Sequence, residues 1–579
     1  MTEQRPAELL NRTRGLLFGA AVGDALGWPQ EQRSGIVGGQ ASRTTTPGLA
    51  FRRWVRWAGG QYARYQDPVG AGEYSDDTQL LLATARACLH GDDWLSWLTE
   101  FELPAWPLYQ RGGGRAVLSA CQGWRTGTAP WQGPRARVRS YFNAGANGVA
   151  MRIAPHAVTT LTDPTPDRLI SRVVADGVRT HGHPRALLGA VVYALAVRHT
   201  LRQQGTVEYG DVVLAVAGMA QWRDPALALA AVPEGWAEAF SDACDVPFDT
   251  AWTATAREME ALLDTARASL DRAALADDPQ TLAALGCFDK DRNGAGTVTA
   301  AAACYLAARA SVRPSMGLLR AAFLDRADTD TLASMTAALL GALHGTDWIG
   351  PLTREVQDGA YLAQTAAALA GPLPEPGAAG KAPSEASSAT WLGALAENGG
   401  TDRFVDGRAV AQVCKHRLES KSQDVTRFVL VLDDGQSLYV DRAVKKVRPP
   451  AVARAEPSSV PPAAVTRIAV HVRDLAETRR FYGEVLGLAL QGNGPVLYVT
   501  PWLALLETPG PSDTPTAGPL QFTVSSSDTA RVTAMVEKHN VPVIPPGPRD
   551  ISGSLRVIDP DGHEVLVWPV EHDVKQRRA

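Results

Sequence analysis

The sequence predicts a multidomain protein with an all-α N-terminal domain, a small β-rich middle block and an α+β C-terminal domain built from a tandem βαβββ unit. Ala and Leu recur at helical spacing as far as about residue 370, and short alternating strands follow. A strand and helix pattern then occurs twice. At 579 residues, the chain is also too long for one hydrophobic core.

The predicted boundaries follow the composition of the chain. The segments from residue 371 and from residue 448 are rich in Pro, Ala, Gly and Ser, and such segments bury too little apolar surface to order themselves. The predicted division is an all-α domain (1–370), a linker (371–392), a β-rich block (393–447), a second linker (448–464) and the α+β domain (465–570).

Composition excludes several classes of function. The net charge of -4 provides no overall basic field for binding nucleic-acid phosphates. The six cysteines form no CxxC pair, so we expect reduced thiols. The N-terminus lacks the apolar region of a signal peptide, and the longest apolar run, Ala186 to Val197, is too short to cross a bilayer. We therefore expect a cytoplasmic protein without membrane contact.

Two acidic helix starts are the candidate chemical centre. Ser75, Asp76 and Asp77 precede one apolar helical run, and Asp328 and Asp330 precede another. Taken alone, each start is typical of a helix cap, because free backbone N–H groups and the helix dipole favour negative charge there. Together they supply carboxylate and hydroxyl oxygens, the hard ligands that suit Mg²⁺ or Mn²⁺.

Five segments in chain order carry a family resemblance. They are Gly23-Asp24-Ala25-Leu26-Gly27 with Glu31, Ser75-Asp76-Asp77-Thr78, Asn147-Gly148-Val149-Ala150-Met151-Arg152-Ile153-Ala154-Pro155, Thr180-His181-Gly182-His183-Pro184, and Asp328-Thr329-Asp330-Thr331. This set resembles the ADP-ribosylglycohydrolases of the dinitrogenase-reductase-activating type. The third and fourth segments are similar to that family's NGAAMR-x-x-P loop and TH-x-x-P segment.

The resemblance implies an all-α enzyme that cleaves a glycosidic bond at the distal ribose of an ADP-ribosylated protein, nucleic acid or small molecule, with two divalent cations, Mg²⁺ or Mn²⁺. The residues that it implies as metal ligands are Ser75, Asp76, Asp77, Asp328, Asp330 and Thr331. Those that it implies for substrate binding are Asn147, Gly148, Met151, Arg152 and His181. The candidate catalytic residues are Glu31, Asp76 and Asp77.

Several of these residues have alternative interpretations. Arg152 could pair with a phosphate or brace its own loop, and His181 could contact substrate or be a buried structural residue. Asp24 is expected to support the site from behind, or to belong to a helix face that packs through glycines. Nearby aromatic residues could stack on an adenine ring or simply anchor their loop. These aromatic residues are Trp54, Trp57, Tyr62 and Tyr65.

The C-terminal domain has its own resemblance. Its V-x-D-L, FY-x-x-x-LG and DPDG motifs resemble the vicinal oxygen chelate superfamily of glyoxalase and bleomycin-resistance proteins. At the positions where metal-dependent members carry ligands, this chain has Arg467, Pro519 and Leu566, and only Glu507 corresponds loosely to a fourth ligand. We therefore expect a binding or dimerising module rather than a metal enzyme.

Three hypotheses of function remain open at this point. The first is a hydrolase that removes ADP-ribose. The second is a non-enzymatic ADP-ribose-binding or structural protein, and the third is a glyoxalase-like or antibiotic-resistance activity of the C-terminal domain with a regulatory N-terminal domain. The presence of all four acidic ligand candidates favours the first.

Overall fold

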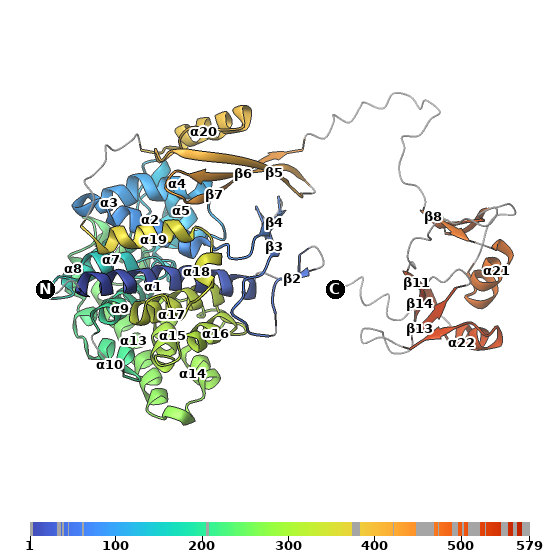
Figure 1. Ribbon diagram of the computed structural model, residues 1–579, viewed down its shortest axis with the longest axis horizontal. Coiled ribbons are helices and arrows are strands. Elements are labelled where there is room, and N and C mark those ends of the chain that lie inside the picture. Colours follow the sequence, from blue (N-terminus) through green and yellow to red (C-terminus); the bar gives the residue numbers. More distant parts are fainter. Residues whose placement is uncertain are drawn as a thin grey trace. The chain divides into compact units, whose positions relative to one another are not determined.

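The chain forms two units, Met1–Val447 and Arg448–Ala579, and each is described by itself (Figure 1). The computed structural model describes residues 4–31, 36–37, 40–44, 46–60, 63–203, 208–372, 382–420 and 422–446 of the first unit. In the second unit it describes residues 468–472, 474–488, 496–500, 503–507, 521–526, 529–545, 554–559 and 564–569. The predicted linker at 448–464 lies outside these ranges.

The first unit is mostly helical as far as residue 370, which confirms the predicted fold class. Its α-helices are α1 (Gln4–Gly27), α2 (Asp76–Cys88), α3 (Trp94–Trp97), α4 (Leu103–Ala105), α5 (Arg115–Arg125), α6 (Arg135–Phe142), α7 (Ala154–Thr159), α8 (Asp167–Gly177), α9 (Pro184–Arg202), α10 (Asp211–Gly218), α11 (Pro225–Leu229), α12 (Trp236–Cys244), α13 (Phe248–Leu270), α14 (Asp278–Leu285), α15 (Gly296–Arg309), α16 (Pro314–Ala322), α17 (Thr329–His344), α18 (Leu352–Glu355) and α19 (Gly359–Ala370). Short 3-10 or π segments are η1 (Trp28–Gln30), η2 (Gly91–Asp93), η3 (Leu98–Glu102), η4 (Trp106–Leu108), η5 (Gln221–Arg223) and η6 (Ala273–Leu275).

Helices α1 and α17 run antiparallel in direct backbone contact, side by side in the unit (Figure 1). Glycines on one face of α1 permit this approach. A Cβ atom at Gly19 would lie 2.2 Å from the carbonyl oxygen of Ala337, and one at Gly23 would lie 2.3 Å from that of Ala333. Because no side chain separates the two backbones, the end of α1 meets the start of α17, where the acidic residues are.

The aromatic residues expected to lie in a loop, from Trp54 to Tyr65, belong in part to a β-hairpin. Strands β3 (Trp54–Ala58) and β4 (Tyr65–Val69) pair antiparallel, and a second short pair is β1 (Ile36–Val37) with β2 (Gln40–Ala41). Alternate side chains of a strand point to opposite faces, so β3 buries Trp54 and exposes Trp57. The two strands are short, and nearby arginines and glycines interrupt the alternation of apolar and polar residues. The sequence pattern therefore does not indicate a hairpin.

The middle block belongs to the first unit and is not a separate body. Helix α20 (Glu385–Asn398) begins inside the predicted 371–392 linker, where Ser384 caps it through a reciprocal hydrogen bond with Ser387. Strands β5 (Val410–Leu418), β6 (Gln423–Leu432) and β7 (Ser437–Lys445) then form an antiparallel sheet, here called the middle sheet. Its apolar side chains, among them Phe428, Leu430 and Leu438, pack in one cluster with Leu80 and Trp106 of the helical region.

The second unit repeats a strand, a helix and further strands, as the sequence predicts, with two strands after the first helix and three after the second among the described residues. Its elements are β8 (Ile468–Val472), α21 (Leu475–Arg479), η7 (Arg480–Val485), β9 (Val496–Thr500), β10 (Leu503–Glu507), β11 (Gln521–Ser526), α22 (Thr529–Lys538), β12 (Val543–Ile544), β13 (Leu555–Ile558) and β14 (Glu564–Pro569). Strand β8 pairs parallel with β10, and β11 pairs parallel with β14. The two halves therefore have related topologies.

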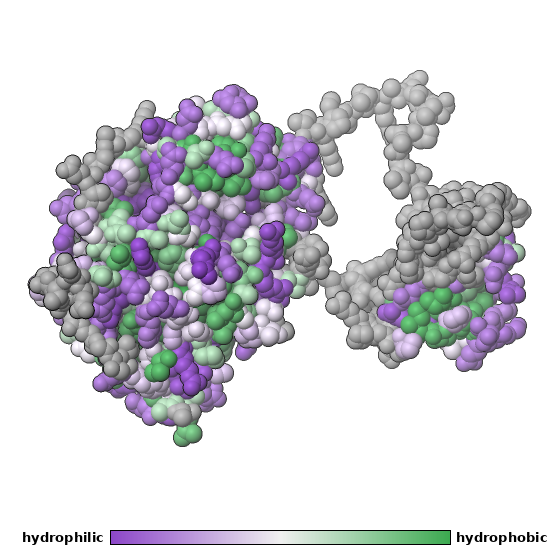
Figure 2. All heavy atoms as spheres, in the orientation of Figure 1, coloured by the Kyte–Doolittle hydropathy of each residue, from purple (hydrophilic) through white to green (hydrophobic). Residues whose placement is uncertain are grey.

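The surface and the cysteines agree with composition. Figure 2 shows hydrophilic and hydrophobic residues intermixed over the visible face of the first unit, with a hydrophobic patch near β6. Within the described ranges, no helix has the length and apolar character needed to cross a membrane. The cysteines are free thiols, as expected.

Replacing Gly23 by Val tests the helix contact. We expect loss of about 1–3 kcal/mol or more of stability, because the added side chain overlaps the backbone of α17. Denaturant unfolding measures the change. The control is Gly393→Ala in α20, where an added Cβ has no neighbour within 4 Å, and where we expect a small gain. Equal effects of the two substitutions would contradict the proposed packing.

Candidate active site

The first acidic helix start is buried and capped. The side chain of Ser75 accepts a hydrogen bond from the backbone N–H of Asp77 at 3.2 Å, as an N-cap residue does. Asp76 and Asp77 occupy the first turn of α2, and only 8% and 3% of their surfaces are exposed. Most capping carboxylates lie in solvent, so this burial indicates a role beyond capping.

Asp24 of α1 holds this helix start from behind. Its fully buried carboxylate accepts hydrogen bonds from the backbone N–H of Ser75 at 3.0 Å and from the N–H and hydroxyl of Thr78 at 3.1 and 2.6 Å. Both expected features of this region, a supporting carboxylate and a glycine packing face, are therefore present on α1. The carboxylate fixes the start of α2 relative to α1, and the glycine face fixes α17 against α1.

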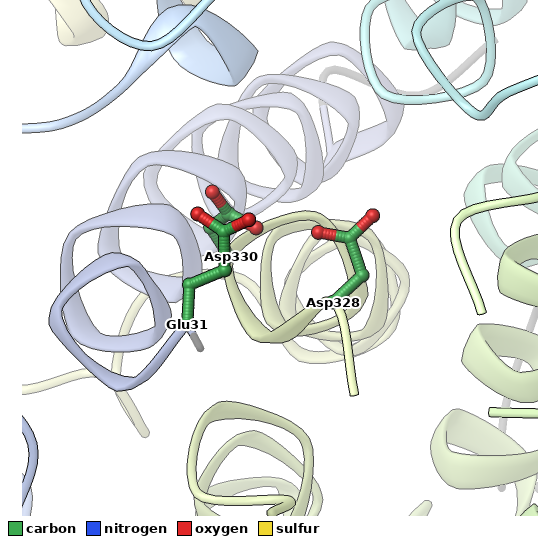
Figure 3. Close-up of side chains that lie close together, drawn as sticks. All are labelled: Glu31, Asp328 and Asp330. Atoms are coloured by element: carbon green, nitrogen blue, oxygen red, sulfur yellow. The ribbon is translucent and has the colours of Figure 1, made fainter. Parts of the chain in front are cut away.

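The second helix start meets the end of α1. The hydroxyl of Thr329 donates to the carbonyl oxygen of Gly27 at 2.9 Å. Carboxylate oxygens of Glu31, Asp328 and Asp330 all lie within 4.8 Å of one another. Figure 3 shows Glu31 just beyond the end of α1 and the two aspartates at the start of α17, with the three carboxylates close together.

These carboxylates repel one another. Burial, together with the negative charges of Asp24 and Glu31, raises the pKa of Asp76 to about 7. Burial and neighbouring carboxylates likewise raise the pKa of Asp77 and of Asp330 well above the ordinary aspartate value. In the cation-free protein, ionising this cluster is therefore costly.

The donor set fits a divalent cation. Oδ2 of Asp77 is buried and has no hydrogen-bond partner in the described part of the chain, although buried carboxylate oxygens are normally paired. The surrounding ligand candidates are carboxylate and hydroxyl oxygens, which suit Mg²⁺ or Mn²⁺. A cation would supply both the missing partner and the compensating charge.

The cluster lines a cavity of about 1130 Å³. Most predicted site residues also line it: Glu31, Asp76, Asp77, Asn147, Gly148, Met151, His181, Asp328, Asp330 and Thr331. Ser75 and Arg152 do not line it. Residues separated by about 300 positions in sequence thus share one concave surface, as ligand sites usually do.

The Asn147 loop is tied directly to the acidic cluster. The Asn147 amide donates to Oδ2 of Asp328 at 2.9 Å and to Thr299 at 3.1 Å, while its backbone N–H donates to Gly294. At Gly148, a Cβ atom would lie 2.9 Å from Cε1 of His181. A side chain there would press on the imidazole, so glycine keeps this wall of the cavity open.

Arg152 points away from the cavity. It is fully buried, pairs with Asp176 at 2.7 Å, and donates to the carbonyl oxygen of Gly148 at 2.7 Å. These contacts favour the bracing interpretation over phosphate binding. His181 lines the cavity, and burial together with the charge of Arg152 lowers its pKa to about 3. Its imidazole is therefore neutral at physiological pH.

Of the aromatic residues in the hairpin region, Trp57 lines the cavity and is 44% exposed. Trp54 is buried edge-on against Trp28, at 5.2 Å between ring centroids, and the hydroxyl of Tyr65 donates to Asp441 at 2.7 Å. These two rings anchor the hairpin. Tyr62 lies outside the described residues.

Sequence reasoning missed part of the cavity wall. Trp28, Arg56, Arg115, Arg137, His183 and Arg185 line it, as do Gly112, Gly113 and Gly114. The run of three glycines is a sequence signal that marks close backbone approach, and a Cβ at Gly112 would lie 2.7 Å from Oδ1 of Asp76. The arginines come from separate elements, and no local pattern distinguishes them from surface arginines.

In the second unit, the predicted positions can be placed only in part. Arg467 and Pro519 lie outside the described residues. Leu566 is a buried residue of β14, and an aliphatic side chain offers no ligand atom. Glu507 ends β10.

Comparison with protein families finds a match for each of two regions of the chain. Residues 5–378, more than half of the chain, match the ADP-ribosylglycohydrolase family model. The chain therefore belongs to the ADP-ribosylglycohydrolase family. Residues 464–567 match the model of the Glyoxalase/Bleomycin resistance protein/Dioxygenase superfamily. No curated protein matches the chain.

Solved structures resemble each region. An ADP-ribosylglycohydrolase-related protein complex is 20% identical, covers 63% of this chain and 98% of its own, and has a TM-score of 0.41. The trypanothione-dependent glyoxalase I of Leishmania major is 21% identical over 20% of this chain and 94% of its own, with a TM-score of 0.18. A lactoylglutathione lyase from Agrobacterium tumefaciens is 23% identical over 20% and 98%, with a TM-score of 0.15. These similarities are too low to support an argument about activity.

The raised carboxylate pKa values predict how stability depends on pH without added cations. Between the ordinary aspartate value of 3.8 and about 7, the folded protein holds a proton on Asp76 that the unfolded chain has released. Stability from this group therefore falls as pH rises through that window, and the loss is complete above about pH 7. The lowered pKa of buried His181 makes its contribution to stability rise with pH instead. The test therefore compares the melting temperatures of wild type and of a variant that lacks only the Asp76 charge.

We expect Asp76→Asn to raise the metal-free melting temperature relative to wild type, and to raise it more at about pH 8 than at about pH 5.5. Thermal melts in chelator measure this difference. Asp242→Asn is the control, because Asp242 is exposed and lies outside the cavity. A lower melting temperature for Asp76→Asn at both pH values would instead indicate a simple structural cap.

Proposed function

We propose that this chain is a Mg²⁺- or Mn²⁺-dependent hydrolase that releases ADP-ribose from an ADP-ribosylated protein, nucleic acid or small molecule. The observation that carries the proposal is the convergence of three carboxylates, one just after η1 and two at the start of α17, beside the buried first turn of α2 within one cavity. Family membership supplies the glycohydrolase class. The cation requirement and the substrate are the proposed parts.

The proposed metal ligands are Ser75, Asp76, Asp77, Asp328, Asp330 and Thr331, with Glu31 at the edge of the cluster. Two bound cations would hold the hydroxyls of the distal ribose and orient a water molecule. Ser75 does not line the cavity, and its hydroxyl already caps α2, so a ligand role for Ser75 has the least geometric support.

The remaining residues of the cavity bind and orient the substrate. Asn147 aligns Asp328 through its amide, and Gly148 leaves room for the ribose and diphosphate beside neutral His181. Cleavage develops positive charge on the ribose ring, and an acidic wall stabilises that charge. Glu31 is the proposed proton-handling group because it belongs to the carboxylate cluster and lines the cavity.

A non-enzymatic ADP-ribose-binding protein is the rival proposal. Such a protein would need the cavity but not the paired acidic helix starts, whose mutual repulsion costs stability when no cation is bound. The carboxylate cluster favours the enzyme, as does Oδ2 of Asp77, which has no hydrogen-bond partner among the described residues.

We expect Asp77→Asn and Asp330→Asn to weaken Mn²⁺ binding at least about tenfold and to lower turnover by about 100-fold. Calorimetry measures binding, and a panel of substrates ADP-ribosylated on arginine, serine, a nucleobase or a small metabolite measures turnover. Because cations compete with the protons that these carboxylates hold, wild-type binding should also weaken as pH falls. Asp242→Asn is the charge-matched control, and unchanged binding in both site variants would refute the metal centre.

We also propose that the glyoxalase-like domain recruits or binds partners and takes no part in hydrolysis. The proposed site residues all lie in the first unit. Removal of residues 448–579 should therefore leave hydrolysis of a small ADP-ribosyl substrate within about twofold of wild type, while activity on a macromolecular substrate falls because local concentration is lost. Loss of activity on the small substrate, or metal-dependent isomerase activity of the isolated domain, would refute this division.

A further inference from the structure

The middle sheet makes a buried polar contact with the segment that leads into α2. Asp67 of β4 is fully buried and pairs with three arginines: Arg56 at 2.7 Å, Arg111 at 2.9 Å and Arg427 of β6 at 2.5 Å. Arg427 also pairs with Asp441 at 2.7 Å. The three guanidinium groups outweigh the effect of burial and lower the pKa of Asp67, so this carboxylate is firmly ionised.

A second contact runs through Glu73. Its carboxylate accepts a hydrogen bond from the hydroxyl of Tyr439 in β7 at 2.7 Å and pairs with Arg111 at 2.5 Å. The guanidinium of Arg111 also lies over the Tyr439 ring, 4.4 Å from its centroid. Side chains alternate along a strand. Arg427 and Tyr439 therefore lie on the opposite face of the middle sheet from the apolar side chains that pack with Leu80 and Trp106.

Backbone contacts strengthen the same junction. The backbone N–H of Gln66 donates to the carbonyl oxygen of Glu419 at 2.9 Å. Asp358 accepts from the Tyr74 hydroxyl at 2.6 Å and from the backbone N–H of Ser437 at 3.1 Å. The middle sheet thus holds residues on both sides of Glu73.

Two paths lead from these contacts to Asp76. Glu73 is three residues before Asp76 in the chain, and Arg111 is followed by Gly112, where a Cβ would lie 2.7 Å from Oδ1 of Asp76. The Gly112 backbone has φ of +109°, a conformation that glycine tolerates. A shift of Arg111 or Glu73 would therefore move the groups that confine the Asp76 carboxylate.

The middle sheet itself does not line the cavity, and it lies beyond residue 378, where the match to the glycohydrolase family model ends. We propose that the middle sheet is a built-in brace for the cation site, in which Arg427 and Tyr439 act as positioning residues that hold Asp76 through Arg111 and Glu73. This inference rests on the proposed function, because it takes Asp76 as a cation ligand. It adds a part of this chain, outside the family-matched region, on which cation binding depends.

The test measures Mn²⁺ affinity by calorimetry in the full-length protein, at a temperature well below melting. Tyr439→Phe removes one hydroxyl and keeps the ring beneath Arg111, whereas Arg427→Gln removes one charge from the Asp67 group. We expect affinity to weaken about 10- to 100-fold in each variant, the range typical of residues that orient metal ligands. Circular dichroism and melting curves confirm that each variant is folded.

Arg417→Gln is the matched control, because Arg417 lies on β5 of the same sheet and pairs with Asp424 at the surface. Its affinity should equal that of wild type. Wild-type affinity in folded Tyr439→Phe and Arg427→Gln would overturn the brace and leave the proposed function intact. Failure of the wild-type protein to bind Mn²⁺ would overturn the proposed function and the brace together. Should Arg427→Gln fail to fold, Tyr439→Phe alone decides the outcome.

Discussion

The close backbone contact between α1 and α17 is the constraint on which the rest of the first unit depends. Glu31 follows α1 by a short 3-10 turn and α17 has Asp330 in its first turn, and such carboxylates normally remain in solvent, where their repulsion is screened. Because glycines remove every side chain from part of the interface, the two helix ends come together and carry Glu31 and Asp330 into one cluster. The packing of small residues thus creates an electrostatic problem that a divalent cation would resolve.

The other parts of the site are arranged around this pair of helices. Asp24, in the last turn of α1, accepts hydrogen bonds from two backbone N–H groups and one hydroxyl at the start of α2 and fixes that helix in place. Asn147 connects the opposite cavity wall to Asp328. Arg152, which does not line the cavity, is paired with Asp176 inside the protein. This pairing separates residues that can meet a substrate from residues that only hold the walls.

Much of the site could be predicted because its ligand candidates lie in short local patterns. Ser75-Asp76-Asp77 and Asp328-Thr329-Asp330-Thr331 each stand directly before an apolar helical run, so both their position and their chemistry are visible in the chain. Arg152 illustrates the limit of such reasoning. Its place in the motif was compatible with phosphate binding or with bracing, and only its contact with Asp176 at 2.7 Å favours bracing.

The sequence by itself determined the helical class of the first region, the repeated unit at the C-terminal end and the oxygen-rich ligand set, because helical spacing, strand alternation and helix caps are local properties. Tertiary structure alone decided which distant residues meet. Arg427 lies 360 positions after Asp67, and Tyr439 lies 366 after Glu73. The β-rich block therefore looked like a separate module in sequence. Ion pairs and hydrogen bonds of this kind have no periodicity along the chain, and their partners are chosen by packing.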